Sequence, residues 1–588
     1  MNVVKKIKKQ IIETASNNPE KFYPVEALKS FDLKRQKCQK CGVMFWSSIT
    51  REICGDTSCV KEYSFIENSP CEKPIEFQEV YFKFSELLQK EGYTPIKNYP
   101  VVARWRDDLD FTIASIVDFQ PYVVSGEIAP PAQYLTVPQN CLRFGDIDNV
   151  GYTGRHHTGF TMIGQHTFQK PENYNPNNYF TIWFKWYLEG LKIQKDELVV
   201  HEDAWAGGGN CGASLEVFSR GLEIGNQVYM TYDMNNANDI SELKELDLKV
   251  LDMGMGQERC CWISKGSLNS FEACMPEVCK YLFETTKIQP DWNIYKKFLP
   301  FSGNLNLDEI EDIDLEWQKI ADKIKINVKE LKEKIEPIAA IYQIADYTRT
   351  LLYALTDGAL PSNVKGGYNL RLILRKTLDN INKFNWNIDL DEVMRIHANS
   401  LSKLYPELSK ELLGISKILK LETIKHQNHK EKVENKIKSL VKKGKTLTTD
   451  EFIKYYISDG ITPEEFEISF NKQGIKIEIP NNFFTLVTEF FESRKTSDNI
   501  EKKNKLAEFT NGIPNTELLF YEDINLLETE VNILKEFTCD NENYIILDKT
   551  IFYPTMGGQA SDIGFIGDKK IVEAIKIGGV ICHRVLKN

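Results

Sequence analysis

Four cysteines near the N-terminus have the spacing of a metal site. Cys38, Cys41, Cys54 and Cys59 form the pattern C-x2-C-x12-C-x4-C in a short polar stretch. Two close pairs of thiolates can surround a zinc ion tetrahedrally with little loss of chain entropy. The second pair is spaced more widely than in most zinc knuckles, so reduced cysteines without a metal are the alternative. The pattern favours a structural zinc site.

An arginine ahead of a glycine- and aspartate-rich loop is a second candidate for chemistry. Residues 139–168 read QNCLRFGDIDNVGYTGRHHTGFTMIGQHTF, which predicts two strands joined by a long loop. On the first strand, the permanently charged guanidinium of Arg143 could bind the negative charge that develops on a phosphate under attack. Phe160 on the second strand could stack on a base, although a lone Phe in such a region more often belongs to the core.

Two glycine-bearing segments could complete a small-ligand site. Residues 201–218 read HEDAWAGGGNCGASLEVF, where consecutive glycines permit close approach of a ligand and Trp205 can form a pocket wall. A simple tight turn is the alternative for this segment. Residues 248–262 read LKVLDMGMGQERCCW, which predicts a strand followed by a helix with Arg259 in its first turns. Such glycine patterns are weak signals when taken alone.

Several helices and strands must position these residues. The pattern of apolar residues predicts an α+β domain, preceded by an extension and followed by a helical region. Aromatic and β-branched residues mixed with Gly and Pro over 66–303 predict an α+β domain after the cysteine-bearing extension 1–65. Apolar residues at three- and four-residue spacing in Val328 to Leu355 and Leu370 to Ile381 predict helices. We therefore expect an all-helical region over 304–491.

The C-terminal part of the chain changes character twice. Residues 492–510 are charged and poor in apolar residues, which predicts a solvated linker. Residues 511–588 return to strands and turns. A lysine-rich stretch at 425–445 is either a local basic face or a solvated helical hairpin, and the sequence leaves both interpretations open.

Composition excludes several classes of protein. The 588 residues are too many for one compact core, and the net charge of −11 argues against a protein that coats nucleic acid indiscriminately. No apolar run reaches the roughly 18 residues of a membrane span, and no signal peptide is recognisable. The 13 cysteines lack a framework spacing, so a cytosolic location with reduced thiols is expected.

Together, the segments DNVGYTGRHHTGF, WAGGGN, DMGMGQER and DGALPSNVKGGYNLR occur in an order that resembles alanyl-tRNA synthetases of the archaeal type. The resemblance covers nearly the whole chain. It implies a class II antiparallel sheet with flanking helices, a helical domain that binds the tRNA acceptor stem, and a partial editing β-barrel. It also implies that ATP and Mg²⁺ serve to activate L-alanine as alanyl-adenylate, which is then transferred to tRNA(Ala).

The resemblance assigns roles within the aminoacylation site. Arg143 would contact the α-phosphate of ATP, and Arg259 would hold the γ-phosphate. Asp252 matches the carboxylate that pairs with the ammonium group of alanine, and Trp205 matches the wall of its side-chain pocket. The residues that would accommodate adenine are Gly254, Gly256 and Phe160, whose ring would stack on the base. Thr161 stands where the family usually has glutamate, which leaves the partner of adenine undefined.

The resemblance extends to tRNA recognition in the helical region. Asn363 matches the asparagine that reads the G·U wobble pair of the acceptor stem. Arg371 and Arg375 are expected to hold the nearby backbone. The family's partner aspartate has no direct counterpart, and Asp459 is the candidate substitute.

The resemblance to the editing domain is incomplete. YIILDKTIFYPTMGGQASDIGFI looks like its opening strands, but the zinc-binding histidine motif of the family is not found in this sequence. The chain is either a truncated form or a half-enzyme that a second polypeptide completes; we favour the second, because a barrel cut partway exposes strand edges. A synthetase paralogue that binds tRNA without catalysis is the alternative function, and retention of Arg143, Asp252 and Arg259 argues against it.

Overall fold

The computed structural model describes most of the chain. The described ranges are 3–60, 63–106, 108–145, 147–234, 237–305, 313–442, 447–459, 461, 463–471, 474–475, 477, 479–480, 483, 505–521, 523, 526–554 and 561–586. The chain divides into two compact units. The first comprises residues 1–102, 111–360 and 369–419, and the second comprises 103–110, 361–368 and 420–588.

The first unit is built on one large sheet, which has nine strands among the described residues. In sheet order these are β1 (Lys34–Lys37), β2 (Met44–Ser47), β6 (Leu198–Gly207), β7 (Asn210–Ser219), β8 (Leu222–Asp233), β9 (Lys244–Gly256), β5 (Gly159–Gln169), β4 (Tyr134–Leu142) and β3 (Thr94–Pro95). Neighbouring strands are antiparallel except for β3 and β4, which are parallel. The α+β architecture expected from the sequence is therefore confirmed.

The N-terminal extension is part of this sheet rather than a separate layer. Phe45 and Trp46 of β2 pair with His201 and Val200 of β6. The cysteine-bearing segment is thereby hydrogen-bonded to a strand that lies much later in the sequence. The helices of this region are α1 (Val3–Asn17), α2 (Pro19–Phe22), α3 (Val25–Ser30) and α4 (Thr57–Val60). The boundaries of the predicted domains remain predictions.

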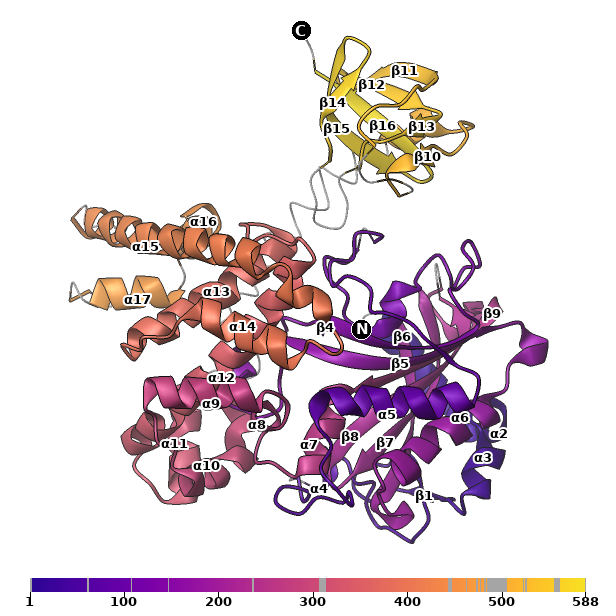
Figure 1. Ribbon diagram of the computed structural model, residues 1–588, viewed down its shortest axis with the longest axis vertical. Coiled ribbons are helices and arrows are strands. Elements are labelled where there is room, and N and C mark those ends of the chain that lie inside the picture. The colour runs from indigo at the N-terminus through magenta and orange to yellow at the C-terminus, as the bar shows by residue number, and fades with distance from the viewer. Residues whose placement is uncertain are drawn as a thin grey trace. The chain divides into compact units, whose positions relative to one another are not determined.

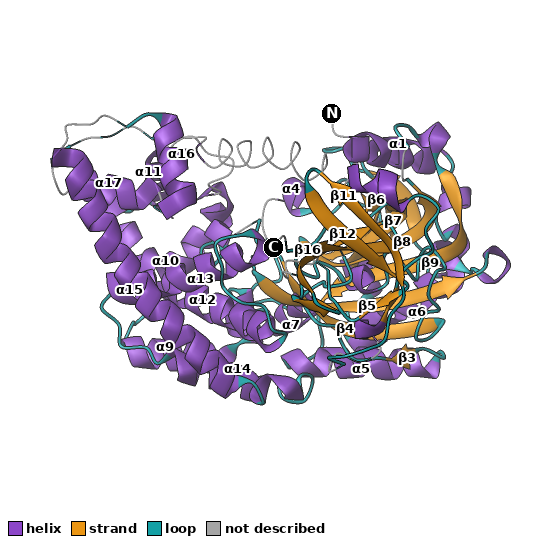
Figure 2. Ribbon diagram, turned by 90° about the horizontal axis from the view of Figure 1, so that it is seen from above, coloured by secondary structure: helices purple, strands orange, loops and turns teal. Residues whose placement is uncertain are grey.

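Helices cover one face of the sheet, as Figures 1 and 2 show for α5 (Phe77–Lys90) and α6 (Pro176–Lys185). We call this the back face; it carries Ile163, Leu251 and Met253, which belong to the main core with α5, α6 and α7 (Gln257–Lys265). Helix α5 forms because most of its apolar residues recur at helical spacing on one buried face: Phe77, Val80, Tyr81, Phe84 and Leu88.

The opposite face, which we call the front face, is only partly covered. It carries alternate residues of β5 and β9, namely Phe160, Met162, His166, Asp252 and Gly254. A segment starting with a 3₁₀ turn at Ser115–Asp118 packs Ile116, Phe119, Val123 and Val124 over part of this face, forming a second apolar cluster. The rest of the front face remains available to a ligand.

Helices follow the sheet, as the sequence predicts. They are α8 (Ser270–Cys274), α9 (Pro276–Thr286), α10 (Trp292–Phe298), α11 (Ile313–Ile324), α12 (Val328–Thr356), α13 (Lys365–Lys383), α14 (Leu390–Ser400), α15 (Leu412–Lys442), α16 (Thr449–Asp459) and α17 (Pro463–Asn471). The helices predicted at 328–355 and 370–381 are α12 and α13. The lysine-rich stretch at 425–445 lies in α15 as far as Lys442, where the helix ends. Most of the predicted linker, 492–504, lies outside the described residues.

The C-terminal part of the second unit contains a five-stranded antiparallel sheet within its described residues. Its order is β11 (Ile533–Cys539), β12 (Glu542–Leu547), β16 (Val580–Val585), β15 (Lys569–Ile577) and β14 (Gly564–Ile566), and a short parallel pair is formed by β10 (Glu517–Leu518) and β13 (Lys549–Thr550). Ile546, Ile575 and Cys582 lie in its core. The glutamine of the editing motif, Gln559, lies outside the described residues.

Candidate active site

The front face brings the predicted ligand-binding residues together through strand register. His166 of β5 lies opposite Asp252 of β9, Gly164 opposite Gly254, and Met162 opposite Gly256. Side chains of alternate residues share a face, so Phe160, Asp252 and the glycines are placed on one surface. A Cβ at Gly254 would lie 2.8 Å from the sulfur of Met162, so a larger residue there would displace the Met162 side chain.

Arg143 and Phe160 form one end of the site. Arg143 directly follows β4, and its backbone N–H donates to the Thr158 carbonyl oxygen at 2.9 Å. Its guanidinium stacks over the Phe160 ring at 4.9 Å from the centroid, and its Nε donates to the Ile113 carbonyl oxygen at 2.9 Å. The Arg143 side chain is exposed. The guanidinium of Arg143 is oriented by these contacts but remains exposed, so it can bind a phosphate while the neighbouring aromatic ring stacks on a base.

Arg259 forms another part of the site with two carboxylates. It lies in the first turn of α7, with its guanidinium 2.8 Å from a carboxylate oxygen of Glu223. Burial and the neighbouring Glu223 raise the pKa of Glu216 to about 8. Asn226 donates to Glu216 at 3.1 Å and lies opposite Gly254. Sequence reasoning missed Asn226, Glu216 and Glu223, because only strand pairing places them beside the glycines.

Asp252 is a buried carboxyl group whose protonation responds to a ligand. It is 7% exposed, and burial raises its pKa to about 7. His166 lies 3.5 Å away, but burial lowers the pKa of this histidine to about 3, so its ring is neutral and supplies no positive charge. A cationic group brought to Asp252 would stabilise the carboxylate. The position therefore suits recognition of an ammonium group.

Trp205 stands on β6 near the apolar cluster that covers the front face. Its half-buried ring packs against this cluster, and its strand partner is Gly212. The turn that follows contains Gly208, where a Cβ would lie 2.5 Å from Oε1 of Gln120. The amide of Gln120 donates to Asn210 at 2.8 Å, so the covering segment is anchored to this turn. The glycines thus form a tight hairpin turn that also admits a neighbouring segment.

Thr161 is hydrogen-bonded to Glu258 and to Asn140. Its backbone N–H lies 3.1 Å from both carboxylate oxygens of Glu258, and its hydroxyl donates to Asn140 Oδ1 at 3.1 Å. Both groups are buried on the back face, away from Phe160. A contact between β5 and α7 could not be read from residues that lie 97 positions apart.

The four N-terminal cysteines form a cluster that is compatible with a metal ion. Their sulfur atoms lie within 4.8 Å of one another, and the pairs Cys38–Cys59 and Cys41–Cys54 are 3.8 and 3.7 Å apart. Sulfur ligands of a tetrahedral zinc are separated by about 3.8 Å. Burial raises the pKa of Cys38, but backbone N–H groups, chiefly those of Cys41 and Lys40, outweigh this and lower it to about 6. The donor set therefore fits zinc.

A sequence model described as tRNA synthetases class II (A) matches residues 77–588, which include the whole front face described above. The chain belongs to the class II tRNA synthetases. An alanine--tRNA ligase from Methanocella arvoryzae is 40% identical over 98% of this chain and 64% of its own length. One from Nitrosopumilus maritimus is 37% identical over 98% of this chain and 63% of its own length. The chain thus spans somewhat less than two thirds of these curated relatives.

A likeness to a solved structure is much weaker. The pyrrolysyl-tRNA synthetase from Desulfitobacterium hafniense is 13% identical, with a TM-score of 0.25 over 34% of this chain and 73% of its own. No helix in the described parts of this synthetase is long and apolar enough to cross a membrane.

The residues predicted to contact tRNA belong to both units. Arg371 and Arg375 lie one turn apart on α13 and are half-buried in the first unit. Asn363 is exposed in the segment 361–368 of the second unit. Asp459 is the last residue of α16, and its side chain lies outside the described part of the synthetase.

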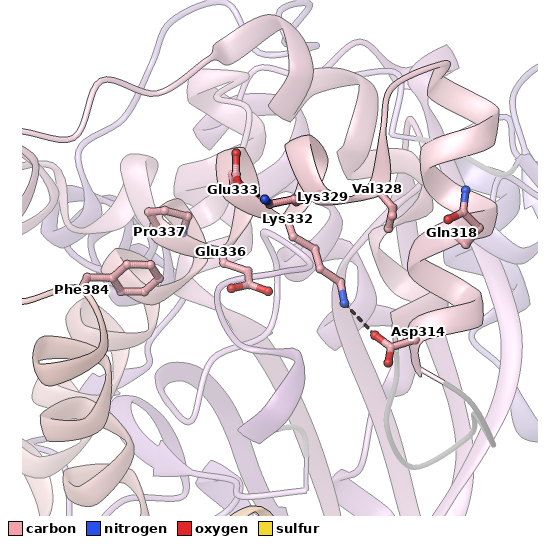
Figure 3. A pocket seen from close by; sticks show the side chains of 9 residues that line it. All are labelled: Asp314, Gln318, Val328, Lys329, Lys332, Glu333, Glu336, Pro337 and Phe384. Atoms are coloured by element: carbon pink, nitrogen blue, oxygen red, sulfur yellow. Dashed lines mark hydrogen bonds and ion pairs between the residues drawn. The ribbon is translucent and has the colours of Figure 1, made fainter. Parts of the chain in front are cut away.

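A surface depression of about 550 Å³ lies between α11 and the start of α12, apart from the predicted site residues (Figure 3). Its charges are already paired within the protein: Lys332 contacts Asp314 at 2.7 Å, and Lys383 reaches Glu336 at 2.8 Å. Pro337 and Phe384 line its apolar end. The depression contributes nothing to the site on the front face.

Proposed function

We propose that this synthetase activates L-alanine with ATP and transfers it from alanyl-adenylate to the 3′ end of tRNA(Ala). The observation that carries the proposal is one sheet face holding Arg143 beside Phe160, Arg259 and the buried Asp252. Two relatives covering nearly the whole chain are named alanine--tRNA ligase.

ATP would bind across β5 and β9 between the two arginines. The adenine would stack on Phe160, with Gly254 and Gly256 keeping the strand clear of bulky side chains. Arg143 would stabilise charge on the α-phosphate as the alanine carboxylate attacks, and Arg259 would hold the γ-phosphate. This attack forms the mixed anhydride and releases pyrophosphate, so no nucleophile from the protein is required.

Members of the class II family use ATP with Mg²⁺, which neutralises phosphate charge when bound. Glu216 and Glu223 fit a cation because burial, together with the neighbouring charge of Glu223, raises the pKa of Glu216 to about 8. With the cation absent, Glu216 holds a proton that a bound cation would displace. Arg259 beside Glu223 would then be positioned to turn from carboxylate to phosphate.

Alanine would be bound through its charged ends. Asp252 would accept the ammonium group, and this ion pair would favour the carboxylate form of Asp252. Trp205 would form the wall for the methyl group. Discrimination against glycine or serine by such a pocket is limited to about 1–3 kcal/mol, which explains why separate editing is useful.

We further propose roles outside the activation site. Asn363 and Asp459 would read the acceptor stem of tRNA, with Arg371 and Arg375 on its backbone. The four cysteines would hold a structural zinc that fixes β1 and β2 against β6. Further strands of the editing domain, carried on a second polypeptide, would pair with the C-terminal sheet. A cytoplasmic location remains a prediction.

The test is alanine-dependent exchange of pyrophosphate into ATP by this chain. Wild type should show exchange that depends on alanine, and Asp252→Ala should lower it by about 100-fold or more through loss of the ammonium contact. Asp196→Ala removes an exposed acid from the 3₁₀ turn before β6 and serves as the matched control. Normal exchange in Asp252→Ala would refute the assignment of the alanine site.

A further inference from the structure

A fully buried polar group on α12 lies directly beneath the strand that carries Phe160. Helix α12 is buried from Ile338 to Leu355, so its polar side chains must find partners inside the protein. Asp346 and Arg349 are 0% and 1% exposed. Arg349 reaches Gly159 of β5 and Glu258 of α7. Asp346 reaches His157 and Thr158, which directly precede β5, and it also lies 3.8 Å from Arg349 on its own helix. The contacts they make are specific to the backbone around Phe160.

Arg349 holds the peptide groups on both sides of Phe160. Its Nη2 donates to the carbonyl oxygen of Gly159 at 2.5 Å. Its Nη1 lies 3.1 Å from Glu258, whose carboxylate accepts from the backbone N–H of Thr161. The residue before Phe160 and the residue after it are thus fixed through one ion pair. Glu258 also directly precedes Arg259 in the first turn of α7.

Asp346 fixes the same strand one residue earlier. Its Oδ2 accepts from the backbone N–H and the hydroxyl of Thr158, at 2.8 and 2.6 Å. The carbonyl oxygen of Thr158 in turn accepts from the backbone N–H of Arg143. His157 contacts the other oxygen of Asp346 at 2.8 Å. One helical turn of α12 therefore holds the backbones of both Phe160 and Arg143.

Helix α12 packs closely against β5 at Gly159. A Cβ at Gly159 would lie 2.5 Å from Oγ1 of Thr350 and 3.1 Å from its Cα, so α12 lies directly on the strand. A buried ion pair is often no more stabilising than apolar residues of the same volume. A gain in stability therefore does not explain well why Arg349, Glu258 and Asp346 are charged. The hydrogen bonds that these charged groups make to the backbone of β5 explain it better, because they fix the position of that backbone.

We infer that Arg349, with Glu258 and Asp346, is a positioning residue that sets the ATP-binding geometry of Phe160, Arg143 and Arg259. None of the three would touch ATP. The inference rests on the proposed function, because it assumes that ATP occupies the front face. Its effect is confined to the ATP end, since Asp252 lies farther along β9 and pairs with His166 rather than with Phe160.

The test compares Arg349→Gln and Arg349→Lys with wild type, using full-length chain. Lysine keeps a positive charge beside Glu258 but lacks the forked donors that reach Gly159 as well. We expect both variants to weaken ATP binding and to raise the KM for ATP in exchange by on the order of 10- to 100-fold, the scale of misplaced site residues. The KM for alanine should stay within about twofold, and Arg349→Lys should regain most of the thermal stability lost in Arg349→Gln.

Thr348→Val is the matched control. Thr348 is buried on the same turn of α12, but its hydroxyl bonds to Ile344 and Ala345 of its own helix and to His397. It should lower stability without changing the KM for ATP. An ATP affinity within about twofold of wild type in folded Arg349→Lys, or an equal loss in Thr348→Val, would overturn the inference.

Equilibrium binding of ATP without amino acid separates this inference from the proposed function. Wild type that binds ATP but shows no alanine-dependent exchange would refute the alanine assignment and leave the Arg349 comparison intact. Wild type that fails to bind ATP would refute both.

Discussion

At the scale of single residues, the site combines exposed arginines with a buried carboxyl group. Arg143 and Arg259 remain positively charged in any environment, so the protein has only to orient their guanidinium groups. Asp252 differs, because burial raises its pKa to about 7, so both its acid and its carboxylate form are populated near neutral pH. Its charge state is therefore linked to binding of a cation.

Asp252→Asn should separate function from stability. A raised carboxyl pKa means that Asp252 contributes stability fully below pH 4, and that this is lost as pH rises through about 7. At pH 8 the variant should therefore be more stable than wild type, by up to about 4 kcal/mol, while losing alanine-dependent exchange. Chemical denaturation at pH 4 and pH 8 measures the difference. Equal stability of both proteins at the two pH values would contradict the assigned burial cost.

At the scale of elements, the front face depends on what is fixed behind and beside it. The cysteine cluster anchors β1 and β2 at one edge, and α12 anchors β5 from the back face. Both arrangements join segments that are far apart in the sequence. They determine whether the residues of the site meet.

Zinc removal should loosen the edge of the sheet. Metal analysis of purified chain should find about one zinc per chain, and Cys41→Ser should lower zinc content and thermal stability, because a tetrahedral site loses one of its sulfur ligands. Cys71→Ser is the control, since Cys71 lies outside the cluster. Full zinc content in Cys41→Ser, or no zinc in wild type, would show that the cluster is only a set of reduced thiols.

Gly159→Ala should be strongly destabilising, because the new methyl group would meet the hydroxyl oxygen of Thr350 at 2.5 Å. We expect a loss of about 1–3 kcal/mol in the free energy of unfolding, typical of overpacking. Thr350→Ala in the same chain should recover only part of this loss, because it removes the hydroxyl group but leaves the backbone of α12 close to the strand. A double variant no more stable than Gly159→Ala would place the strain elsewhere.

Patterning predicted the elements better than their contacts. The apolar spacing of 328–355 specified α12, and the glycines before Arg259 specified the end of β9 and the start of α7. Local sequence carries such information, because periodicity reflects one buried face. It could not reveal that Glu258 is the partner of Thr161, or that Asn226 lies beside Gly254. These contacts arise from register and packing between distant segments.

At the scale of the whole molecule, the chain has two units with different degrees of closure. The large sheet of the first unit is covered on its back face by helices. The described C-terminal sheet instead ends in β14, where Ile563 and Phe565 nearby are 70% and 65% exposed. Exposed apolar side chains at a sheet edge favour pairing with additional strands.

The most direct test of the account is detection of the activated intermediate itself. The chain should be mixed with ATP, Mg²⁺ and equal amounts of alanine, glycine and serine in a single turnover, and the adenylates identified by mass spectrometry. Alanyl-adenylate should exceed each of the others by roughly 10- to 200-fold, as a pocket of this size allows. Absence of any aminoacyl-adenylate, or a larger amount of another one, would contradict an alanine-activating site between Arg143 and Arg259.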